Sequence, residues 1–169
     1  MIIGICGKSG SGKSTIARKI ASIIPDSVYL DIDKIGHEVL VYPEVQAQIK
    51  ETFGIESTDR KALGDIVFNN RYEMDKLTDI TWSHMKVLIQ KFIDDNKDKT
   101  IILDWLLLTK SHFFNMCDVK ILIDAPYEIR LARAMKRDNI TQEAFETREK
   151  ASEQYNKQDF DYVIETIEH

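Results

Sequence analysis

The sequence predicts an α/β fold with a parallel β-sheet, and three observations indicate it. Short and almost wholly apolar runs recur along the 169 residues, as strands buried on both faces of a parallel sheet require. Longer segments with apolar residues at helical spacing separate these runs. The first apolar run passes through a glycine-rich turn directly into a helical pattern. Strands that alternate with helices in this way favour a single α/β domain.

Five short apolar runs are the predicted strands. They are Ile2–Cys6, Val28–Leu30, Thr100–Asp104, Val119–Asp124 and Asp161–Ile164. The tripeptide Asp31-Ile32-Asp33 is expected to end the second strand. Because helical segments lie between the strands, the expected architecture is a three-layer α/β/α fold with a five-stranded parallel sheet.

The segments between the strands carry apolar residues at i, i+3 and i+4 spacing. They predict helices over Ser14–Ile24, Pro43–Phe53, Lys61–Asn69 and Tyr72–Asp94. After the fourth strand, Pro126 is expected in the first turn of a further helix, a position that proline tolerates. Thr141 is expected to cap the helix after that, with Gln142 and Glu143 in its first turn.

Composition excludes several classes of protein. The formal net charge of -5 argues against a general nucleic-acid binder, whose charge balance is basic. The apolar runs fall far short of the ~20 residues that a membrane span needs, and the first run lacks the basic segment of a secretory signal. Cys6 and Cys117 lie in apolar runs and are expected as small core residues. We therefore expect a cytoplasmic protein without a membrane or nucleic-acid partner.

The turn after the first strand matches a phosphate-binding pattern. Residues 7–14 fit G-x-x-x-x-G-K-[ST] in full, between a strand and a helix as the pattern requires. In such a loop, backbone N–H groups wrap a polyphosphate, the lysine reaches the β- and γ-phosphates, and the hydroxyl binds Mg²⁺. The expected nucleotide contacts are Gly7, Gly10, Ser11, Gly12, Lys13, Ser14 and Thr15. The sequence has no Asn-Lys-x-Asp motif after a strand, so ATP is favoured over GTP.

Acidic residues follow two of the predicted strands, at the edge where open α/β sheets bind ligands. Within the pair Asp31 and Asp33, one acid is expected to orient the metal's water shell and the other to accept a proton from a substrate hydroxyl. Asp104 takes a Walker-B-like position, where binding of Mg²⁺ or a structural role is expected. His37 lies close to the acid pair and is a candidate substrate contact. The other histidines, which show no metal-ligand spacing, are His84, His112 and His169.

Three arginines share one predicted helix. Arg130, Arg133 and Arg137 lie at i, i+3 and i+7 and therefore project roughly along one face. Arginines supply charge and paired hydrogen bonds to the oxygens of a transferring phosphoryl group. Arg148 is a further candidate on the next helix. The segment from residue 130 to residue 150 is therefore expected to form a short lid that excludes water.

Taken together, the motifs resemble those of the dephospho-CoA kinase family over nearly the whole chain. The phosphate loop GKSGSGKST is similar to that of the family, although many kinases share it. DIDKIGHEVL at residues 31–40 resembles the family's acidic motif, and DRKALGDIVF at residues 59–68 its substrate-side helix. APYE at residues 125–128, followed by Arg133 and Arg137, resembles the lid helix, and DYVI at residues 161–164 the final strand.

The resemblance implies transfer of the γ-phosphate of ATP, with Mg²⁺, to the ribose 3′-hydroxyl of dephospho-CoA, which gives coenzyme A. It implies Asp33 as the acid facing that hydroxyl, with Asp31 as the second choice. Arg60 would belong to the substrate side, while Arg133 and Arg137 would be lid arginines. Residues 1–169 are accordingly expected to form a single P-loop kinase domain. Its helical substrate-binding region would cover residues 35–95, and the lid would cover residues 130–150. The protein is expected to be a monomer or weak oligomer.

Two departures from the family pattern leave alternatives open. Trp82-Ser83 stands where the family usually has His-Pro. After the third strand the family has Pro-Leu-Leu-Phe-Glu, whereas here Trp105 is followed by Leu106–Lys110. One alternative is a (deoxy)nucleoside monophosphate kinase, whose acceptor phosphate needs no general base and for which Arg60 and Arg71 are candidate contacts. The other is a catalytically silent nucleotide-binding regulatory module. The intact Lys13 and Ser14 argue against the silent module.

Overall fold

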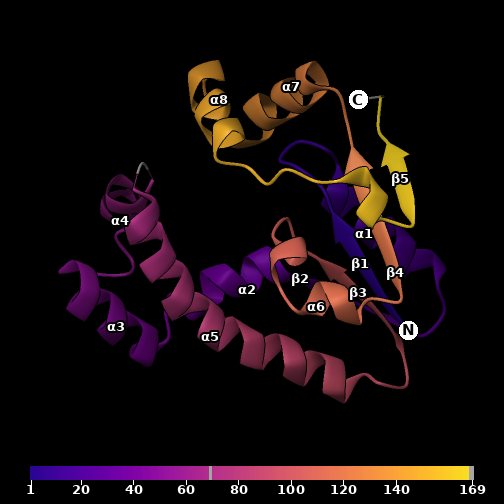
Figure 1. The fold of residues 1–169 in the computed structure, drawn as a ribbon, viewed down its shortest axis with the longest axis horizontal. Coiled ribbons are helices and arrows are strands. Elements are labelled where there is room, and N and C mark those ends of the chain that lie inside the picture. The colour runs from indigo at the N-terminus through magenta and orange to yellow at the C-terminus, as the bar shows by residue number, and fades with distance from the viewer. Residues whose placement is uncertain (69, 168–169) are drawn as a thin grey trace. The chain divides into compact units, whose positions relative to one another are not determined.

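The computed structural model describes residues 1–68 and 70–167, and within these residues five parallel strands form one sheet (Figure 1). The strand order is β2-β3-β1-β4-β5, with β1 at the centre. The strands are β1 (Ile2–Cys6), β2 (Ser27–Asp31), β3 (Thr100–Asp104), β4 (Val119–Asp124) and β5 (Tyr162–Glu165). All five predicted strands are confirmed, and so is the α/β fold with a five-stranded parallel sheet.

Helices connect the strands, and six of those described were predicted from the sequence, whereas the helices over residues 32–39 and 113–116 were not. The helices are α1 (Lys13–Ile23), α2 (Ile32–Val39), α3 (Pro43–Phe53), α4 (Arg60–Val67), α5 (Arg71–Asp95), α6 (Phe113–Met116), α7 (Tyr127–Asp138) and α8 (Gln142–Lys150). Two short 3-10 helices, η1 (Leu108–Lys110) and η2 (Lys157–Asp159), complete the described elements. Asn69, the predicted last residue of one helix, lies outside the described residues, as does His169.

Local sequence predicted the ends of three elements, and one of these predictions is wrong. The acidic tripeptide ends β2 as expected, with Asp31 as the last residue of the strand, and Ile32 and Asp33 already belong to α2. Pro126 is the N-cap of α7 and does not lie in its first turn: its ψ of 147° is extended, so the helical backbone starts at Tyr127. The cap of α8 is as predicted, since the Thr141 hydroxyl accepts a hydrogen bond of 3.1 Å from the Ala144 N–H.

The central strand buries both of its faces, as the parallel sheet requires. Ile3 and Ile5 point to one face, where they pack with Ala17 of α1 in a buried core. Gly4 points to the other face, where a Cβ would lie 2.6 Å from the Cys117 Sγ and 2.8 Å from a methyl group of Leu108. Only glycine therefore lets the η1–α6 segment approach β1 so closely.

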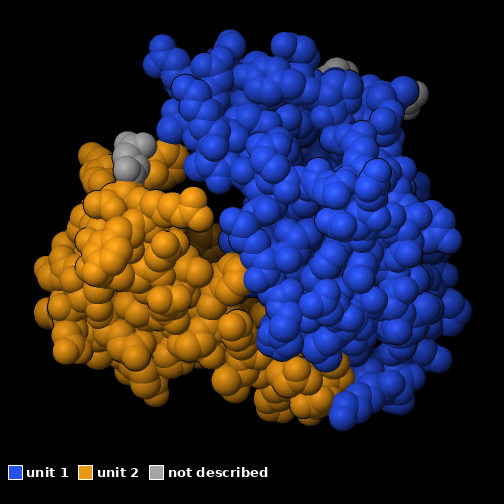
Figure 2. Space-filling model, viewed as in Figure 1, with its two compact units in different colours: residues 1–31, 96–169 blue, residues 32–95 orange. Residues whose placement is uncertain are grey.

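The described chain divides into two compact units (Figure 2). The first holds the sheet, with residues 1–31 and the chain from residue 96 onward. The second is the continuous segment Ile32–Asp95, in which α2, α3 and α4 each contact the long helix α5. Val39, Ile49 and Ile89 are completely buried in this helical unit. None of the described helices combines the length and the apolar character that crossing a membrane takes.

Candidate nucleotide site

The phosphate loop connects β1 to α1, and its shape depends on glycine. Gly10 and Gly12 have φ values of 79° and 88°, in the left-handed region that side chains with a Cβ disfavour. The Ser11 N–H donates a hydrogen bond of 3.0 Å to the Lys8 carbonyl, which closes a tight turn inside the loop. A Cβ on Gly10 would also collide with the backbone of Arg130, whose Cα lies 2.8 Å from that position.

Inside the loop, a buried hydroxyl faces a crowded glycine. Ser11 is fully buried, and its Oγ has no hydrogen-bond partner among the described residues. A Cβ on Gly7 would stand 2.6 Å from this Oγ and 2.7 Å from the Ile123 carbonyl oxygen. Buried hydroxyls are nearly always hydrogen-bonded, so an unpaired one in a loop of this shape is consistent with a binding site for phosphate oxygens.

Lys13, the first residue of α1, is buried and paired with an acid. Its Nζ donates to Oδ1 of Asp104, the last residue of β3, and the Asp104 side chain is fully buried. The second carboxylate oxygen, Oδ2, accepts a hydrogen bond of 2.5 Å from the Tyr29 hydroxyl. Both oxygens of the acid therefore have protein partners, one on the phosphate loop and one on β2.

Sheet register explains why these groups meet. Asp104 is paired with Ile5 of β1 on one side and with Asp31 of β2 on the other. All three positions lie at the carboxyl end of the sheet, where the phosphate loop begins. Asp31 and Asp104, two of the predicted site acids, are thus brought to the same edge.

Arg133 of α7 contacts the phosphate loop itself. Its Nη1 lies 3.3 Å from the carbonyl oxygens of Gly10 and Ser11, and it donates a hydrogen bond of 2.9 Å to the Thr166 hydroxyl. Thr166, just after β5, in turn donates a hydrogen bond of 2.6 Å to the Ser11 carbonyl. The loop backbone is therefore held from outside by two side chains that come from late in the sequence.

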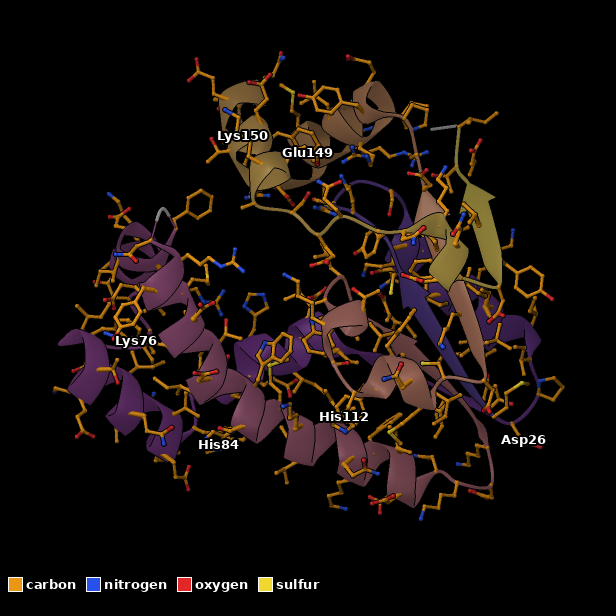
Figure 3. All side chains as sticks on the ribbon, in the orientation of Figure 1. Asp26, Lys76, His84, His112, Glu149 and Lys150 are labelled. Atoms are coloured by element: carbon orange, nitrogen blue, oxygen red, sulfur yellow. The ribbon has the colours of Figure 1, made fainter. Side chains whose placement is uncertain are left out.

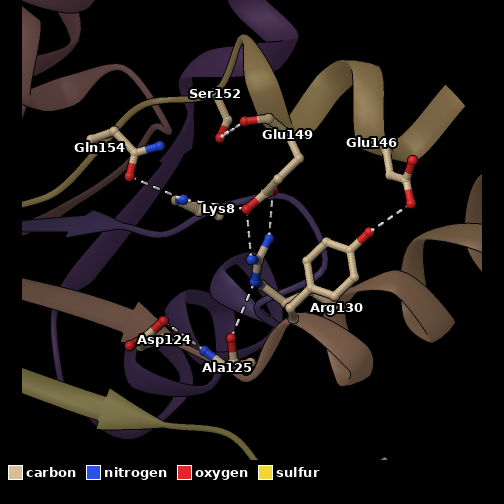
Figure 4. Close-up of polar contacts among 9 residues, drawn as sticks. Lys8, Asp124, Ala125, Arg130, Glu146, Glu149, Ser152 and Gln154 are labelled. Carbon is tan, nitrogen blue, oxygen red and sulfur yellow. Dashed lines mark hydrogen bonds and ion pairs between the residues drawn. The ribbon is translucent and has the colours of Figure 1, made fainter. Parts of the chain in front are cut away.

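Arg130 lies on the same helix but has a different environment (Figure 4). It is buried, and it makes two hydrogen bonds to Glu149 on α8. Nη1 donates to Oε2 and Nη2 donates to Oε1, each at 2.7 Å. Its Nε donates to the Ala125 carbonyl at 3.1 Å, and Lys8 of the phosphate loop reaches the same carboxylate at 3.3 Å. The hydrogen bonds from Arg130 hold the pKa of Glu149 below its usual value, although partial burial opposes this effect.

Arg137 lies at the end of α7 with more than half of its side chain exposed. Its guanidinium donates to both carboxylate oxygens of Asp138, at 2.8 and 2.9 Å, and Nη2 lies 3.3 Å from the Ser9 hydroxyl. Arg148 of α8 donates to Asp138 at 2.8 Å. The bonds from Arg137, followed by those from Arg148, lower the pKa of Asp138 to about 2.

The helical unit carries the remaining predicted residues. Asp33 lies in the first turn of α2 and His37 in its last turn, both exposed. The two are four residues apart and therefore share one face of the helix. Arg60 begins α4, whose N-cap Asp59 accepts a hydrogen bond of 3.0 Å from the Ala62 N–H.

The histidines do not form a metal site in the described part of the chain. His84 lies within α5 and His112 immediately before α6 (Figure 3). No group of three or more His, Cys, Asp or Glu side chains that could hold a metal ion occurs among the described residues. Any Mg²⁺ site would therefore rely on few protein ligands, as is usual for a metal bound together with a nucleotide.

Comparison with known proteins agrees with this geometry. A family model for dephospho-CoA kinase matches residues 1–166. The chain belongs to the dephospho-CoA kinase family. The family predicted from the motifs is confirmed, and the two alternatives, a nucleoside monophosphate kinase and a silent module, are not favoured.

Relatives of this family cover most of the chain. The dephospho-CoA kinase of Fusobacterium nucleatum is 38% identical over 154 residues, which span 86% of this chain and 78% of the relative. That of Aquifex aeolicus is 34% identical over 158 residues, spanning 86% of this chain and 77% of the relative. This level of identity places the chain among ATP-dependent kinases.

Solved structures support the fold. The dephospho-CoA kinase of Campylobacter jejuni is 26% identical, with a TM-score of 0.62, and the match covers 99% of this chain and 89% of that protein. A Thermus thermophilus protein matches with a TM-score of 0.81 at 24% identity, covering 98% of this chain and 88% of the other. The latter likeness concerns the fold alone.

Within this dephospho-CoA kinase family member, three residues of the site region were missed by sequence reasoning. The first is Tyr29, which contacts Asp104 from 75 positions away in the sequence. The second is Glu149, which contacts Arg130 from 19 positions away, and the third is Thr166, which contacts the Ser11 carbonyl from 155 positions away. From the sequence, a tyrosine in an apolar strand is predicted to be a core residue, and a glutamate on a charged helix is predicted to be exposed to solvent. No local pattern in the sequence distinguishes them.

Proposed function

We propose that this chain transfers the γ-phosphate of ATP to the ribose 3′-hydroxyl of dephospho-CoA, producing coenzyme A. The observation that carries the proposal is the phosphate loop, with Lys13 held by Asp104 at the carboxyl edge of the sheet, in a chain that matches the family over residues 1–166. Phosphoryl transfer needs mainly positioning and charge stabilisation, and the loop supplies both.

The loop binds the triphosphate through its backbone N–H groups, the α1 N-terminus and Lys13. Lys13 leaves Asp104 for the phosphates as the nucleotide enters, because a polyphosphate carries more negative charge than one carboxylate. The free hydroxyl of Ser11 donates to a phosphate oxygen. Arg133 acts on the same phosphates through the loop carbonyls that it holds, whereas Arg137, more exposed, supplies positive charge to the transferring group.

The oxygen ligands near the loop suit Mg²⁺. Ser14 lies in the first turn of α1, and the Asp104 carboxylate lies at the neighbouring strand end. Mg²⁺ prefers oxygen ligands and keeps several waters beside one or two protein groups and the substrate phosphates. When bound, the ion neutralises charge on the phosphates. Ser14 would hold it directly, and Asp104 would do so after one of its two present partners is released.

The acceptor hydroxyl requires a base, and we assign this role to Asp33, with Asp31 orienting the metal's water shell. A carboxylate can take the proton that the attacking hydroxyl loses. His37 and Arg60 would contact the substrate from the helical region of residues 35–95. The segment of residues 130–150 acts as the lid.

The decisive experiment is a coupled assay with ATP and Mg²⁺. The acceptors are dephospho-CoA, the common nucleoside monophosphates and deoxymonophosphates, and none. We expect turnover with dephospho-CoA alone. Turnover that appears only with a nucleotide acceptor would overturn the proposal, as would ATP binding without any transfer.

The base is tested separately with Asp33→Asn, for which Asp98→Asn, in the exposed turn before β3, is the control. We expect a loss of kcat of about 10²-fold or more in Asp33→Asn, consistent with general-base catalysis, and little change in the control. Full activity of Asp33→Asn would contradict the assignment.

We further propose that the enzyme works in the cytoplasm as a monomer or weak oligomer. Light scattering on the purified protein tests the oligomeric state.

A further inference from the structure

Tyr29 occupies a position that none of the phosphate-loop motifs includes. It lies in the middle of β2, where its ring packs against the buried core formed by β1, β3 and α1. Tyr29 is paired with Ile102 in β3, so it shares a sheet face with Asp104, two residues further along that strand. Its hydroxyl reaches the Asp104 Oδ2 at 2.5 Å.

The Tyr29 hydroxyl carries one proton, and it donates this proton to Asp104. Burial, above all, and the contact with the Asp104 carboxylate raise the pKa of the phenol above its usual value. Because the Asp104 side chain is fully buried, solvent does not reach the oxygen that accepts this bond.

Together, two donors hold both oxygens of one carboxylate. Tyr29 donates to the Asp104 Oδ2, and Lys13 donates to the Asp104 Oδ1. Asp104 is thus held between the lysine of the phosphate loop and a side chain on another strand. Without the phenol, one Asp104 oxygen would lose its partner in a fully buried site.

We propose that Tyr29 is a positioning residue that orients the Asp104 carboxylate for the binding of Mg²⁺ with the nucleotide. The inference rests on one part of the proposed function, the binding of ATP, and it does not depend on which acceptor receives the phosphate. Mg²⁺ should raise the affinity of the protein for the nucleotide, and the proposal implies that this increase depends on Tyr29. A purely structural role for Tyr29 would instead weaken nucleotide binding equally with and without the metal.

The test uses Tyr29→Phe, which removes one hydroxyl and keeps the ring, and a non-hydrolysable ATP analogue. Calorimetry gives the dissociation constant of the full chain for the analogue with excess Mg²⁺ and with EDTA. We expect the affinity gain due to Mg²⁺ to fall about threefold to tenfold in Tyr29→Phe, the range expected for one lost hydrogen bond, with the EDTA value unchanged. Tyr162→Phe, on the exposed face of β5, is the control and should keep the whole gain.

Equal losses in Mg²⁺ and in EDTA would overturn the proposal, as would an unchanged Mg²⁺ gain. Because the assay contains no acceptor, its outcome does not depend on whether dephospho-CoA is the substrate. Should Tyr29→Phe fold poorly, the wild-type protein with ¹³Cζ-labelled tyrosine gives a second readout. Adding Mg²⁺ to the analogue complex should shift the Tyr29 signal, because the charge of its partner Asp104 is then shared with the metal. A Tyr29 signal that does not respond to Mg²⁺ would also overturn the proposal.

Discussion

The guanidinium of Arg130 on α7 and the carboxylate of Glu149 on α8 face each other through two parallel hydrogen bonds of 2.7 Å each. The Arg130 side chain is only 6% exposed and that of Glu149 20% exposed. The geometry is the paired fork that arginine makes with a carboxylate, the strongest form of such an ion pair. Lys8 joins the same carboxylate, so the pair also connects α8 to the phosphate loop.

Glu149→Ala should destabilise the protein strongly, because it leaves the buried Arg130 charge without its partner. We expect a loss of about 3 kcal/mol in the free energy of unfolding. Lys91→Ala is the matched control, since it breaks an exposed ion pair with Asp95 on α5 and should leave the free energy of unfolding almost unchanged. Urea denaturation measures both, and similar losses in the two variants would contradict the prediction.

Asp138 should make stability fall at acid pH. Its pKa is lowered from 3.8 to about 2 in the folded protein, chiefly by Arg137. Because the folded pKa lies below the unfolded one, the contribution is fully present above pH 4 and is lost as pH falls from about 4 toward 2. Asp138→Asn should therefore lose stability at pH 6 and show a shallower decline below pH 4.

The measurement for Asp138 is the urea midpoint of the wild type and the variant between pH 6 and pH 2. The difference between the two midpoints should shrink as the pH falls. Carbon-detected NMR titration of the carboxyl group gives the pKa directly. A midpoint difference that stays constant over this range would show that Asp138 has no lowered pKa.

Gly10→Ala should be more damaging than Gly54→Ala, although both glycines have left-handed φ values of 79° and 72°. The backbone conformation alone costs a non-glycine residue about 1–2 kcal/mol at either site. A Cβ on Gly54 meets nothing within 4 Å, whereas one on Gly10 runs into the Arg130 backbone. Thermal denaturation should show a larger drop in Tm for Gly10→Ala, with weaker nucleotide binding, and equal drops would rule out the steric contribution.

The two cysteines should be unreactive in the native protein. Burial raises the pKa of the Cys6 thiol to about 12, and burial also raises the pKa of the Cys117 thiol to about 12. Thiolate is the reacting form, so at pH 8 both should resist a thiol reagent such as DTNB. In guanidinium chloride both should react at once. Rapid labelling of the folded protein at either position would contradict these pKa values.

Local patterns predicted the strands and the loop, because each depends on neighbouring residues. The run Ile2–Cys6 is apolar on both faces, and the glycines that follow it permit the positive φ values that the loop needs. Apolar residues at i, i+3 and i+4 spacing likewise predicted α3, α4 and α5. The start of α2 was missed since Asp33 favours turns in isolation, whereas here it serves as an acid in the first turn of a helix, where negative charge is favourable.

The contacts within the site could not be predicted from spacing. Helical periodicity places Arg130, Arg133 and Arg137 on one side of α7, but it does not say what each will meet. Their partners are Glu149 for Arg130, loop carbonyls with Thr166 for Arg133, and Asp138 with Ser9 for Arg137. Each set combines residues from different parts of the chain, so the folded structure was needed to reveal it.

The position of β1 in the sheet has a consequence for biosynthesis. β1 pairs with β3 and β4, with Ile2 matched to Ile101 and Ile3 to Val119. It therefore has no strand partner until synthesis has reached β3, whereas the helical segment Ile32–Asp95 has all of its own contacts available earlier. Pairings this distant in sequence form slowly. We expect the helical segment to fold first, during translation, and the phosphate loop to take its shape only after β3 and β4 have been made.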